Sequence, residues 1–231
     1  MPHCPAVGNQ IFDETFPRFA PSLFVVKLLL LLLMLAGAPE ARESRNRLVY
    51  LLLMLAGAPV PMRAGETLAA GDVAARLAAK RDAATAATVL VFLAHDCPIS
   101  NALVPEINRI ATAYGARGVA FFLVYAERDL GDKAAAAHAR EYALAAPVTV
   151  DREGVLAERA GAKVTPEAAV FSRAGAVVYR GRINDLFAGY GQKRAEPTSH
   201  DLRVALDAVL AGKAPPVATT PAIGCFISTK P

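Results

Sequence analysis

The stretch TVLVFLAHDCPIS, residues 88–100, joins a run of β-prone apolar residues to a turn and the start of a helix. A continuous apolar run such as Thr88–Leu93 is typical of a central strand that is buried on both faces. Pro98 suits the first helical turn, because its missing N–H would be unpaired there anyway. Cys97 would then lie at the positive end of a helix dipole, which lowers the pKa of a thiol. The stretch therefore predicts a thiol-redox site where a strand meets a helix.

Composition bounds the class of protein. The chain has 231 residues, of which 54% are hydrophobic, and a mean hydropathy of +0.33. It is too apolar for disorder and long enough for one core. Lys and Arg number 25 against 21 Asp and Glu, and the chain has no Trp and no run of basic residues. We therefore expect no nucleic-acid partner.

Two apolar runs, 28–38 and 48–58, precede the rest of the chain and contain the same nonapeptide, LLLMLAGAP, at 31–39 and 51–59. Each run falls well short of the ~20 residues that a membrane-spanning helix needs. Both end in Ala-Gly-Ala, which resembles a signal-peptidase site. We interpret residues 1–62 as an export signal with a duplicated segment, and predict a periplasmic or cell-envelope protein. The alternative is an uncleaved segment that attaches the protein to a membrane.

Apolar runs further along predict alternating strands and helices. The helix that begins at Pro98 has an amphipathic period, and Pro105 is expected to kink it. The other expected elements are a short helix in the Ala-rich segment 65–84, strands at 119–125 and 148–150, helices at 131–144 and 154–160, and a hairpin of strands 168–171 and 176–180. This alternation predicts a three-layer α/β domain over residues 63–213.

The last helix is expected from Leu202 to Leu210, with Thr198 and Asp201 as a capping box. The segment 183–199 before it is rich in Gly and polar residues and is predicted to be a loop, in which Arg182 and Asp185 could pair. A Pro-rich tail, 214–231, follows the helix.

The three cysteines are Cys4, Cys97 and Cys225. Cys4 precedes the export signal and is not expected in the mature protein. The spacer from Ala214 to Cys225 could span on the order of 30 Å, enough to cross a small domain. Three alternatives remain open: a redox-active pair of Cys97 and Cys225, a permanent structural disulfide between them, or no pairing.

Other polar residues near the predicted site carry weaker signals. His95 could tune the thiolate or bind a metal, although an ordinary loop histidine is the commoner case. Asp96 would raise the pKa of the neighbouring thiol. Glu127, Asp129 and Asp132 could line a site after the second long strand, or face solvent. No metal-ligand spacing is found, so no metal is predicted.

Taken in order, three features resemble the thioredoxin-like superfamily. Cys97 matches the nucleophile after the first long strand, Pro105 matches the kinking proline of the active-site helix, and the Thr165-Pro166 pair matches the cis-proline loop. The strand and helix inserted around 119–150 are similar to the redoxin branch, also described as alkyl hydroperoxide reductase and thiol-specific antioxidant proteins. Exported bacterial redoxin-domain proteins have segments similar to DCPISN, GRI and IGCFI, which lie here at 96–101, 181–183 and 223–227.

The resemblance covers residues 88–227 and implies a three-layer α/β/α sandwich with a central mixed sheet. It implies that Pro166 is cis and places the backbone of Thr165 beside the Cys97 sulfur. In this superfamily that edge aligns a partner peptide by strand-like hydrogen bonds. The expected substrate-contacting residues are therefore Thr165, Pro166 and Pro98, and no cofactor is implied.

The chain departs from the family's catalytic patterns at three points. Ser100 stands where thioredoxins carry the second cysteine of Cys-x-x-Cys, which removes the local resolving thiol. The peroxiredoxin pattern Pro-x-x-x-Thr/Ser-x-x-Cys is not met, because Leu90 and Ala94 occupy its Pro and Thr/Ser positions. Copper-delivering relatives use two close cysteines and a distal histidine, and Cys97 has no cysteine within four residues.

We therefore interpret the chain as an exported thiol-disulfide oxidoreductase. Cys97 is its candidate nucleophile, Cys225 its candidate resolving thiol, and protein thiols and disulfides are its expected partners. A thiol peroxidase acting on a small hydroperoxide as an antioxidant is the second hypothesis. The third is a non-catalytic binding or electron-transfer accessory protein that keeps the fold without turnover.

Overall fold

The computed structural model describes residues 64–78 and 85–227, all of which belong to a unit that extends from Met62 to Pro231. The apolar runs of the predicted export signal and Cys4 lie outside the described residues, so those expectations stay predictions. None of the helices in the described ranges has the length and apolar character needed to cross a membrane.

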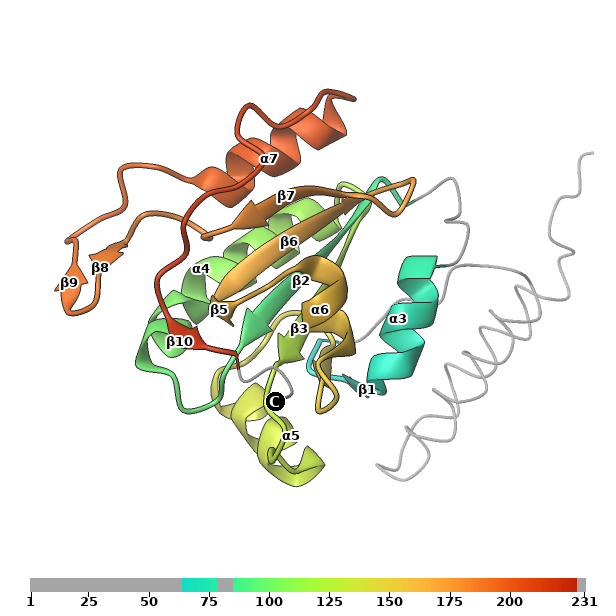
Figure 1. Cartoon of the computed structure of the whole chain (residues 1–231), viewed down its shortest axis with the longest axis vertical. Helices are drawn as coiled ribbons and strands as arrows, with labels where there is room; N and C mark the ends of the chain where they lie inside the picture. Colours follow the sequence, from blue (N-terminus) through green and yellow to red (C-terminus); the bar gives the residue numbers. More distant parts are fainter. Residues whose placement is uncertain (1–63, 79–84, 228–231) are drawn as a thin grey trace, which may run out of the picture. The chain divides into compact units, whose positions relative to one another are not determined.

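A six-stranded sheet forms the middle layer, in the order β1-β4-β3-β2-β6-β7 (Figure 1). The four strands β1, β4, β3 and β2 run parallel, and β6 and β7 are antiparallel to their neighbours. The predicted mixed sheet is confirmed. Its strands are β1 (Thr67–Leu68), β2 (Ala87–Leu93), β3 (Val119–Tyr125), β4 (Val148–Val150), β6 (Glu167–Ser172) and β7 (Val177–Gly181).

Strand β2 lies in the interior of the sheet, because both of its faces are apolar. All seven of its residues are buried, as the apolar run predicts. Val89, Val91 and Leu93 belong to one hydrophobic core, and Leu90 and Phe92 to the other. The carboxyl end of β2, from which the chain turns into the next helix, is therefore held from both sides.

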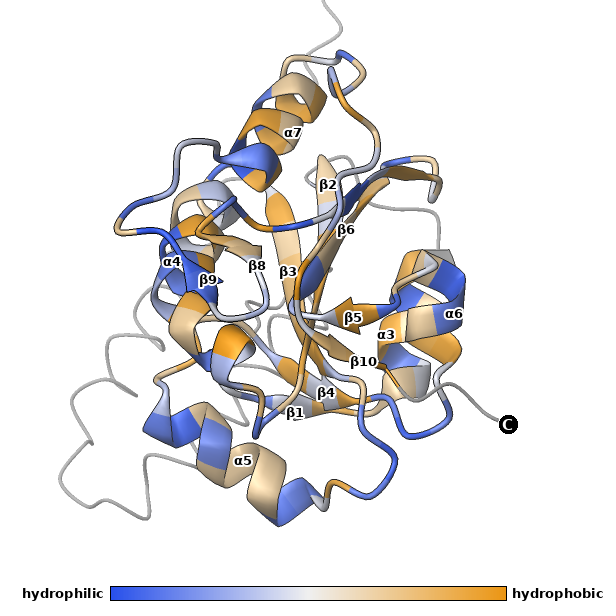
Figure 2. Ribbon diagram, turned by 60° about the vertical axis from the view of Figure 1, so that its left-hand side comes forward, coloured by the Kyte–Doolittle hydropathy of each residue, from blue (hydrophilic) through white to orange (hydrophobic). Residues whose placement is uncertain are grey.

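Helices cover both faces of the sheet, so that the three-layer α/β/α sandwich is confirmed. Helices α4 (Pro98–Gly115), α5 (Asp132–Glu141) and α7 (Asp201–Leu210) contribute to the first core, and α3 (Ala70–Ala78) and α6 (Val155–Ala160) to the second. Figure 2 shows α4 and α7 on one side of the strands and α3 and α6 on the other. Pro105 lies inside α4 without ending it.

Besides β1, four short strands were not expected from the sequence. They are β5 (Val164–Thr165), β8 (Phe187–Gly189), β9 (Gln192–Lys193) and β10 (Cys225–Phe226). Strands β8 and β9 pair with each other inside the segment 183–199, so the prediction of a plain loop there is wrong. Strand β10 comes from the tail and pairs antiparallel with β5, which immediately precedes Pro166 (Figure 1).

Two expectations about polar contacts near α7 are also wrong. The residue at the N-cap is His200, which makes no side-chain capping bond, and Thr198 instead donates a hydrogen bond to Asp185. Arg182 pairs with Asp201 at 2.8 Å, so Asp185 is not its partner. Both errors arise because the contacts of Asp185 and Asp201 depend on how residues 183–201 fold, which the sequence pattern does not show.

Candidate active site

Cys97 is the residue that caps the N-terminus of α4. Its backbone is extended, with φ −80° and ψ 113°, and Pro98 takes the first helical position. The N–H of Cys97 donates to the carbonyl oxygen of Ala94 at 3.3 Å, and its own carbonyl accepts from Asn101 at 3.0 Å. Only 1% of Cys97 is exposed. The predicted strand, turn and helix around this cysteine are confirmed.

The loop before β6 faces Cys97, as expected. The Thr165–Pro166 peptide bond is cis, which confirms the prediction for this pair. The carbonyl oxygen of Thr165 lies 3.4 Å from the Cys97 sulfur and can accept a hydrogen bond from the thiol form. Pro98, the third expected substrate-contacting residue, is exposed at the start of α4.

The tail brings the second cysteine to the first. In the pairing of β10 with β5, Cys225 lies opposite Thr165 and Phe226 opposite Val164. The Sγ atoms of Cys225 and Cys97 are 2.9 Å apart, with both cysteines free. The two sulfur atoms thus lie close together without a disulfide bond, and the three alternatives left open by the sequence stay predictions.

The first anchor of the tail is Thr220, which is buried beside β7. Its hydroxyl group is 2.7 Å from the hydroxyl of Tyr179, and its N–H donates to the carbonyl of Arg180 at 3.0 Å. The N–H of Arg180 in turn donates to the carbonyl of Ala218 at 2.9 Å. A Cβ atom on Gly181 would overlap the backbone of Thr220, so this glycine permits the close approach.

The second anchor surrounds Cys225 itself. The hydroxyl of Tyr190, on the turn between β8 and β9, donates to the carbonyl of Gly224 at 2.6 Å. Beyond the cysteine, the N–H of Ile227 donates to the carbonyl of Lys163 at 2.9 Å. A Cβ atom on Gly224 would overlap the carbonyl group of Thr165. Cys225 therefore reaches Cys97 only because the preceding residue has no side chain.

The two thiols have opposite acidities. Burial raises the pKa of the Cys97 thiol, but hydrogen bonds from Cys225 and from Ser100 outweigh burial and lower this pKa below its ordinary value. The hydrogen bond to Cys97 raises the pKa of Cys225 to about 11, with further contributions from desolvation and from the charges of Cys97 and Asp96. Asp96 thus raises the pKa of the tail thiol, and of the two thiols Cys97 loses its proton first.

An open cleft of about 500 Å³ lies beside the pair of thiols. Its lining includes Thr165, Cys225 and Phe226 on one side, and His95 and Glu127 on another. Phe226 is 81% exposed. The cleft gives an open approach to the tail cysteine, and Cys97 is not part of its lining.

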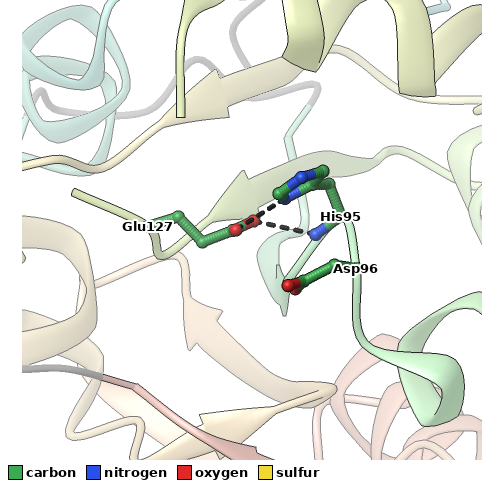
Figure 3. A group of neighbouring side chains, drawn as sticks. All are labelled: His95, Asp96 and Glu127. Atoms are coloured by element: carbon green, nitrogen blue, oxygen red, sulfur yellow. Dashed lines mark hydrogen bonds and ion pairs between the residues drawn. The ribbon is translucent and has the colours of Figure 1, made fainter. Parts of the chain in front are cut away.

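His95, Asp96 and Glu127 come together at the ends of β2 and β3 (Figure 3). Glu127 accepts one hydrogen bond from the backbone N–H of His95 at 2.8 Å and a second contact from His95 Nδ1 at 2.7 Å. One candidate ligand atom of each residue lies within 4.8 Å of the others, a set that could hold a metal ion. The sequence did not indicate it, because Glu127 is distant in the chain. The His95–Glu127 pair explains the arrangement without an ion.

A polar network supports the turn that carries Cys97. The side-chain amide of Asn101 donates to the carbonyl of His95 at 3.0 Å, and its oxygen is 3.0 Å from His138 Nε2. The other ring nitrogen of His138 is 2.7 Å from the hydroxyl of Tyr125. Burial, and then the nearby His95, lower the pKa of His138, which favours its neutral form. The network ties helices α4 and α5 to the end of β3.

The structure thus brings together Cys97, Cys225, Thr165 and Pro166. Sequence reasoning missed two of the residues that position the tail near Cys225, Tyr190 and Gly224. A glycine next to Cys225 was visible, but its meaning depends on the approach of Thr165. No pattern along the chain pointed to Tyr190, which acts from a hairpin that was not predicted.

A mixed sheet between two helical layers, a cysteine at the start of the first long helix and a cis-proline loop opposite it define a thioredoxin-like protein. The model of the Redoxin family matches residues 56–192, more than half of the chain, and the chain belongs to this family. It is a thioredoxin-like redox protein. The matched region ends before the tail, so Cys225 lies outside it.

Two solved structures have the same fold. A hypothetical protein from Sinorhizobium meliloti 1021 is 24% identical, over 63% of this chain and 81% of its own, with a TM-score of 0.56. An uncharacterized conserved protein from Geobacillus kaustophilus is 29% identical, over 63% and 78%, with a TM-score of 0.56. A secreted disulfide oxidoreductase of Mycobacterium tuberculosis is 20% identical, over 55% and 81%, but its TM-score of 0.38 is too low to bear on function. No curated protein matches the chain.

Proposed function

We propose that this protein is an exported thiol-disulfide oxidoreductase in which Cys97 is the nucleophile and Cys225 the resolving thiol. The observation that carries the proposal is the 2.9 Å separation of their sulfur atoms, since Ser100 cannot resolve a mixed disulfide. The opposite pKa shifts of the two thiols favour the same division of roles. Export rests on the apolar runs of residues 1–62.

The proposed cycle starts with the thiolate of Cys97 and the thiol of Cys225. The Cys97 thiolate attacks one sulfur of a substrate disulfide, forms a mixed disulfide and releases the other substrate sulfur as a thiolate. Cys225 then gives up its proton and attacks the Cys97 sulfur. The mixed disulfide breaks, the second substrate thiolate leaves, and the Cys97–Cys225 disulfide forms. The substrate gains two electrons and the protein loses two.

The edge of β5 at Thr165 and Pro166 is the proposed binding edge for a substrate segment, with Pro98 at its rim. Strand β10 occupies this edge in the structure. A substrate strand and the tail therefore compete for the same backbone hydrogen bonds. Because Cys97 is buried under the tail, attack on a large substrate requires that β10 first leaves β5.

The test is mass spectrometry on the full chain after oxidation, with alkylation before any reduction and then digestion. We expect a linked peptide pair that contains Cys97 and Cys225 and that disappears with a mild dithiol. Catalytic reduction of insulin disulfides with dithiothreitol as electron source should accompany it. Two separately alkylated cysteines would remove Cys225 from the mechanism and overturn the proposal.

The same samples distinguish the other hypotheses. Stoichiometric consumption of hydrogen peroxide that depends on Cys97, with no insulin reduction, would identify a thiol peroxidase. No turnover in either assay would leave a non-catalytic accessory protein. The linked peptide that resists mild dithiol would indicate a structural disulfide instead of a redox-active one.

A further inference from the structure

The two sulfur atoms of the site differ in access. Cys97 is 1% exposed and is absent from the lining of the cleft, whereas Cys225 is exposed and forms part of that lining. A group that enters the cleft therefore meets Cys225 before it can reach Cys97. The tail stays paired with β5 during such an approach, since the cleft is open in this arrangement.

The preferred leaving group in thiol-disulfide exchange also favours attack at Cys225. A thiolate that attacks a disulfide expels the other sulfur, and the sulfur with the lower thiol pKa leaves faster. Hydrogen bonds from Ser100 stabilise the Cys97 thiolate, whereas the charge of Asp96 disfavours the Cys225 thiolate, and neither contribution depends on the bond between the two thiols. Both favour Cys97 as the leaving group, which is the group that attack at Cys225 releases.

We propose that an external thiol enters this cleft and reduces the Cys97–Cys225 disulfide by attacking the sulfur of Cys225. The tail cysteine is then the entry point for electrons. The inference rests on the proposed function, because it takes the Cys97–Cys225 disulfide as its starting state. The thiolate RS⁻ bonds to the Cys225 sulfur, the S–S bond breaks, and Cys97 leaves with the electron pair. A second RS⁻ attacks the sulfur of R in the mixed disulfide, which gives RSSR and the Cys225 thiolate, and this takes up a proton.

The charge of the cleft indicates which reductant fits. Among the residues that the structure describes, Asp96, Glu127 and Asp129 line it together with one arginine, Arg128, and with His95. The Asp96 carboxylate also acts directly on the charge of the Cys225 sulfur. Such a surface attracts a cationic thiol and repels an anionic one. The reductant is thus expected to carry positive charge beside its thiol.

The first experiment locates the attacked sulfur. The oxidised full chain is mixed with limiting cysteamine for short times, acidified, blocked with N-ethylmaleimide and digested for mass spectrometry. We expect cysteamine on Cys225 and N-ethylmaleimide on Cys97, with the reverse pattern at least about tenfold rarer at the earliest times. Cysteamine mainly on Cys97, or equally on both, would overturn the proposal.

The second experiment tests the charge. Reduction rates with cysteamine and with 3-mercaptopropionate are each divided by the rate of the same thiol on hydroxyethyl disulfide. At low salt we expect cysteamine to be favoured about three- to tenfold, with a smaller preference in Asp96→Asn and in high salt. Asp72→Asn, an exposed carboxylate on α3 outside the cleft, is the matched control and should keep the full preference. An equal rate for both thiols would overturn the assignment of a cationic reductant.

Failure of the proposed function is visible before reductant is added. If the oxidised sample contains no Cys97–Cys225 peptide pair, the oxidoreductase proposal and the entry point fail together. If the pair is present and cysteamine is found on Cys97, only the entry point fails.

Discussion

The two cysteines of the site come from regions that are built in opposite ways. Cys97 stands where β2 meets α4, and both elements are packed into the core. Cys225 stands in a two-residue strand of a tail that crosses the surface of the domain. The fold therefore fixes the position of one thiol, whereas the position of the other depends on how firmly the tail is bound.

The contacts around Cys225 are few enough to break while the domain stays folded. Hydrogen bonds of Gly224, Cys225 and Ile227 with Tyr190, Thr165 and Lys163 hold its neighbourhood, together with the pairing of β10 with β5 and the buried side chain of Ile227. Each hydrogen bond is worth about 0.5–1.5 kcal/mol net, against about 5–15 kcal/mol for a whole domain. Local release of the tail is thus easier than unfolding. It would expose Cys97 to a substrate, and rebinding would return the resolving thiol.

Replacing each cysteine in turn by serine gives the largest expected effect on activity. Cys97→Ser should lower insulin reduction by at least about 100-fold, because a serine hydroxyl is not ionised at neutral pH as a thiolate is. Cys225→Ser should instead stall after the first step, with substrate trapped on Cys97, which non-reducing gel electrophoresis detects. Trapping on Cys225 in the Cys97→Ser protein, with turnover kept, would reverse the assigned roles.

Gly224→Ala tests whether the tail must approach this closely. The new Cβ atom would overlap the carbonyl group of Thr165, so β10 cannot pair with β5 as it does now. We expect the rate of Cys97–Cys225 disulfide formation to fall at least about tenfold, since the effective concentration of the tail thiol drops. Stopped-flow oxidation with diamide, followed by acid quenching, measures this rate.

Gly71→Ala is the matched control for that substitution, because nothing lies within 4 Å of its added Cβ atom. It should leave the oxidation rate unchanged. Both variants should keep the thermal midpoint of the wild type within a few degrees. Equal rates in the two variants would show that the close contact at Gly224 does not control the meeting of the thiols.

The core of the fold could be predicted from the sequence because its signals are local. The strands 119–125 and 148–150 have the predicted bounds, and the helix after Cys97 begins at the expected proline. Long apolar runs specify their own structure. Two-residue strands such as β5 and β10 are too short for a period and form only because another segment lies beside them.

The residues of the site likewise divide into those that the sequence could predict and those that it could not. Cys97 and the cis-proline loop were recognisable from their order along the chain. From the sequence, the tail was only long enough to let Cys225 reach Cys97. The contact itself could not be predicted, because it depends on the register that sets Cys225 opposite Thr165. Tyr190 and Glu127 act across the fold on residues far away in the chain, so neither their presence nor their spacing could predict their contacts.

Cys225→Ala tests the origin of the difference in acidity. The hydrogen bond from Cys225 is the strongest of those that lower the pKa of Cys97, so its loss should raise that pKa. A higher pKa leaves less thiolate at neutral pH, and exchange at Cys97 should then begin at higher pH than in the wild type. The ¹³Cβ shift of labelled cysteine as a function of pH reports this titration.

In the same measurement, wild-type Cys225 should titrate at about 11. Asp96→Asn should lower the pKa of Cys225, because the carboxylate beside it disfavours the thiolate, and should not raise the pKa of Cys97. An unchanged pKa of Cys97 in Cys225→Ala would mean that the acidity of this thiol does not depend on its contact with the tail.

Tyr190→Phe should have the smallest effect, because it removes one hydrogen bond at an exposed residue. The lost bond, from the hydroxyl to the carbonyl of Gly224, is worth about 0.5–1 kcal/mol, or about two- to fivefold in the ratio of bound to released tail. Hydrogen exchange at the Ile227 amide, which donates to Lys163, should quicken by that factor. Tyr114→Phe also removes one hydrogen bond, to Arg203 on α7 and not to the segment around Cys225, and should leave this exchange rate unchanged. If both variants quicken exchange equally, the tail opens with the whole domain, and the two thiols are held by one structure instead of two.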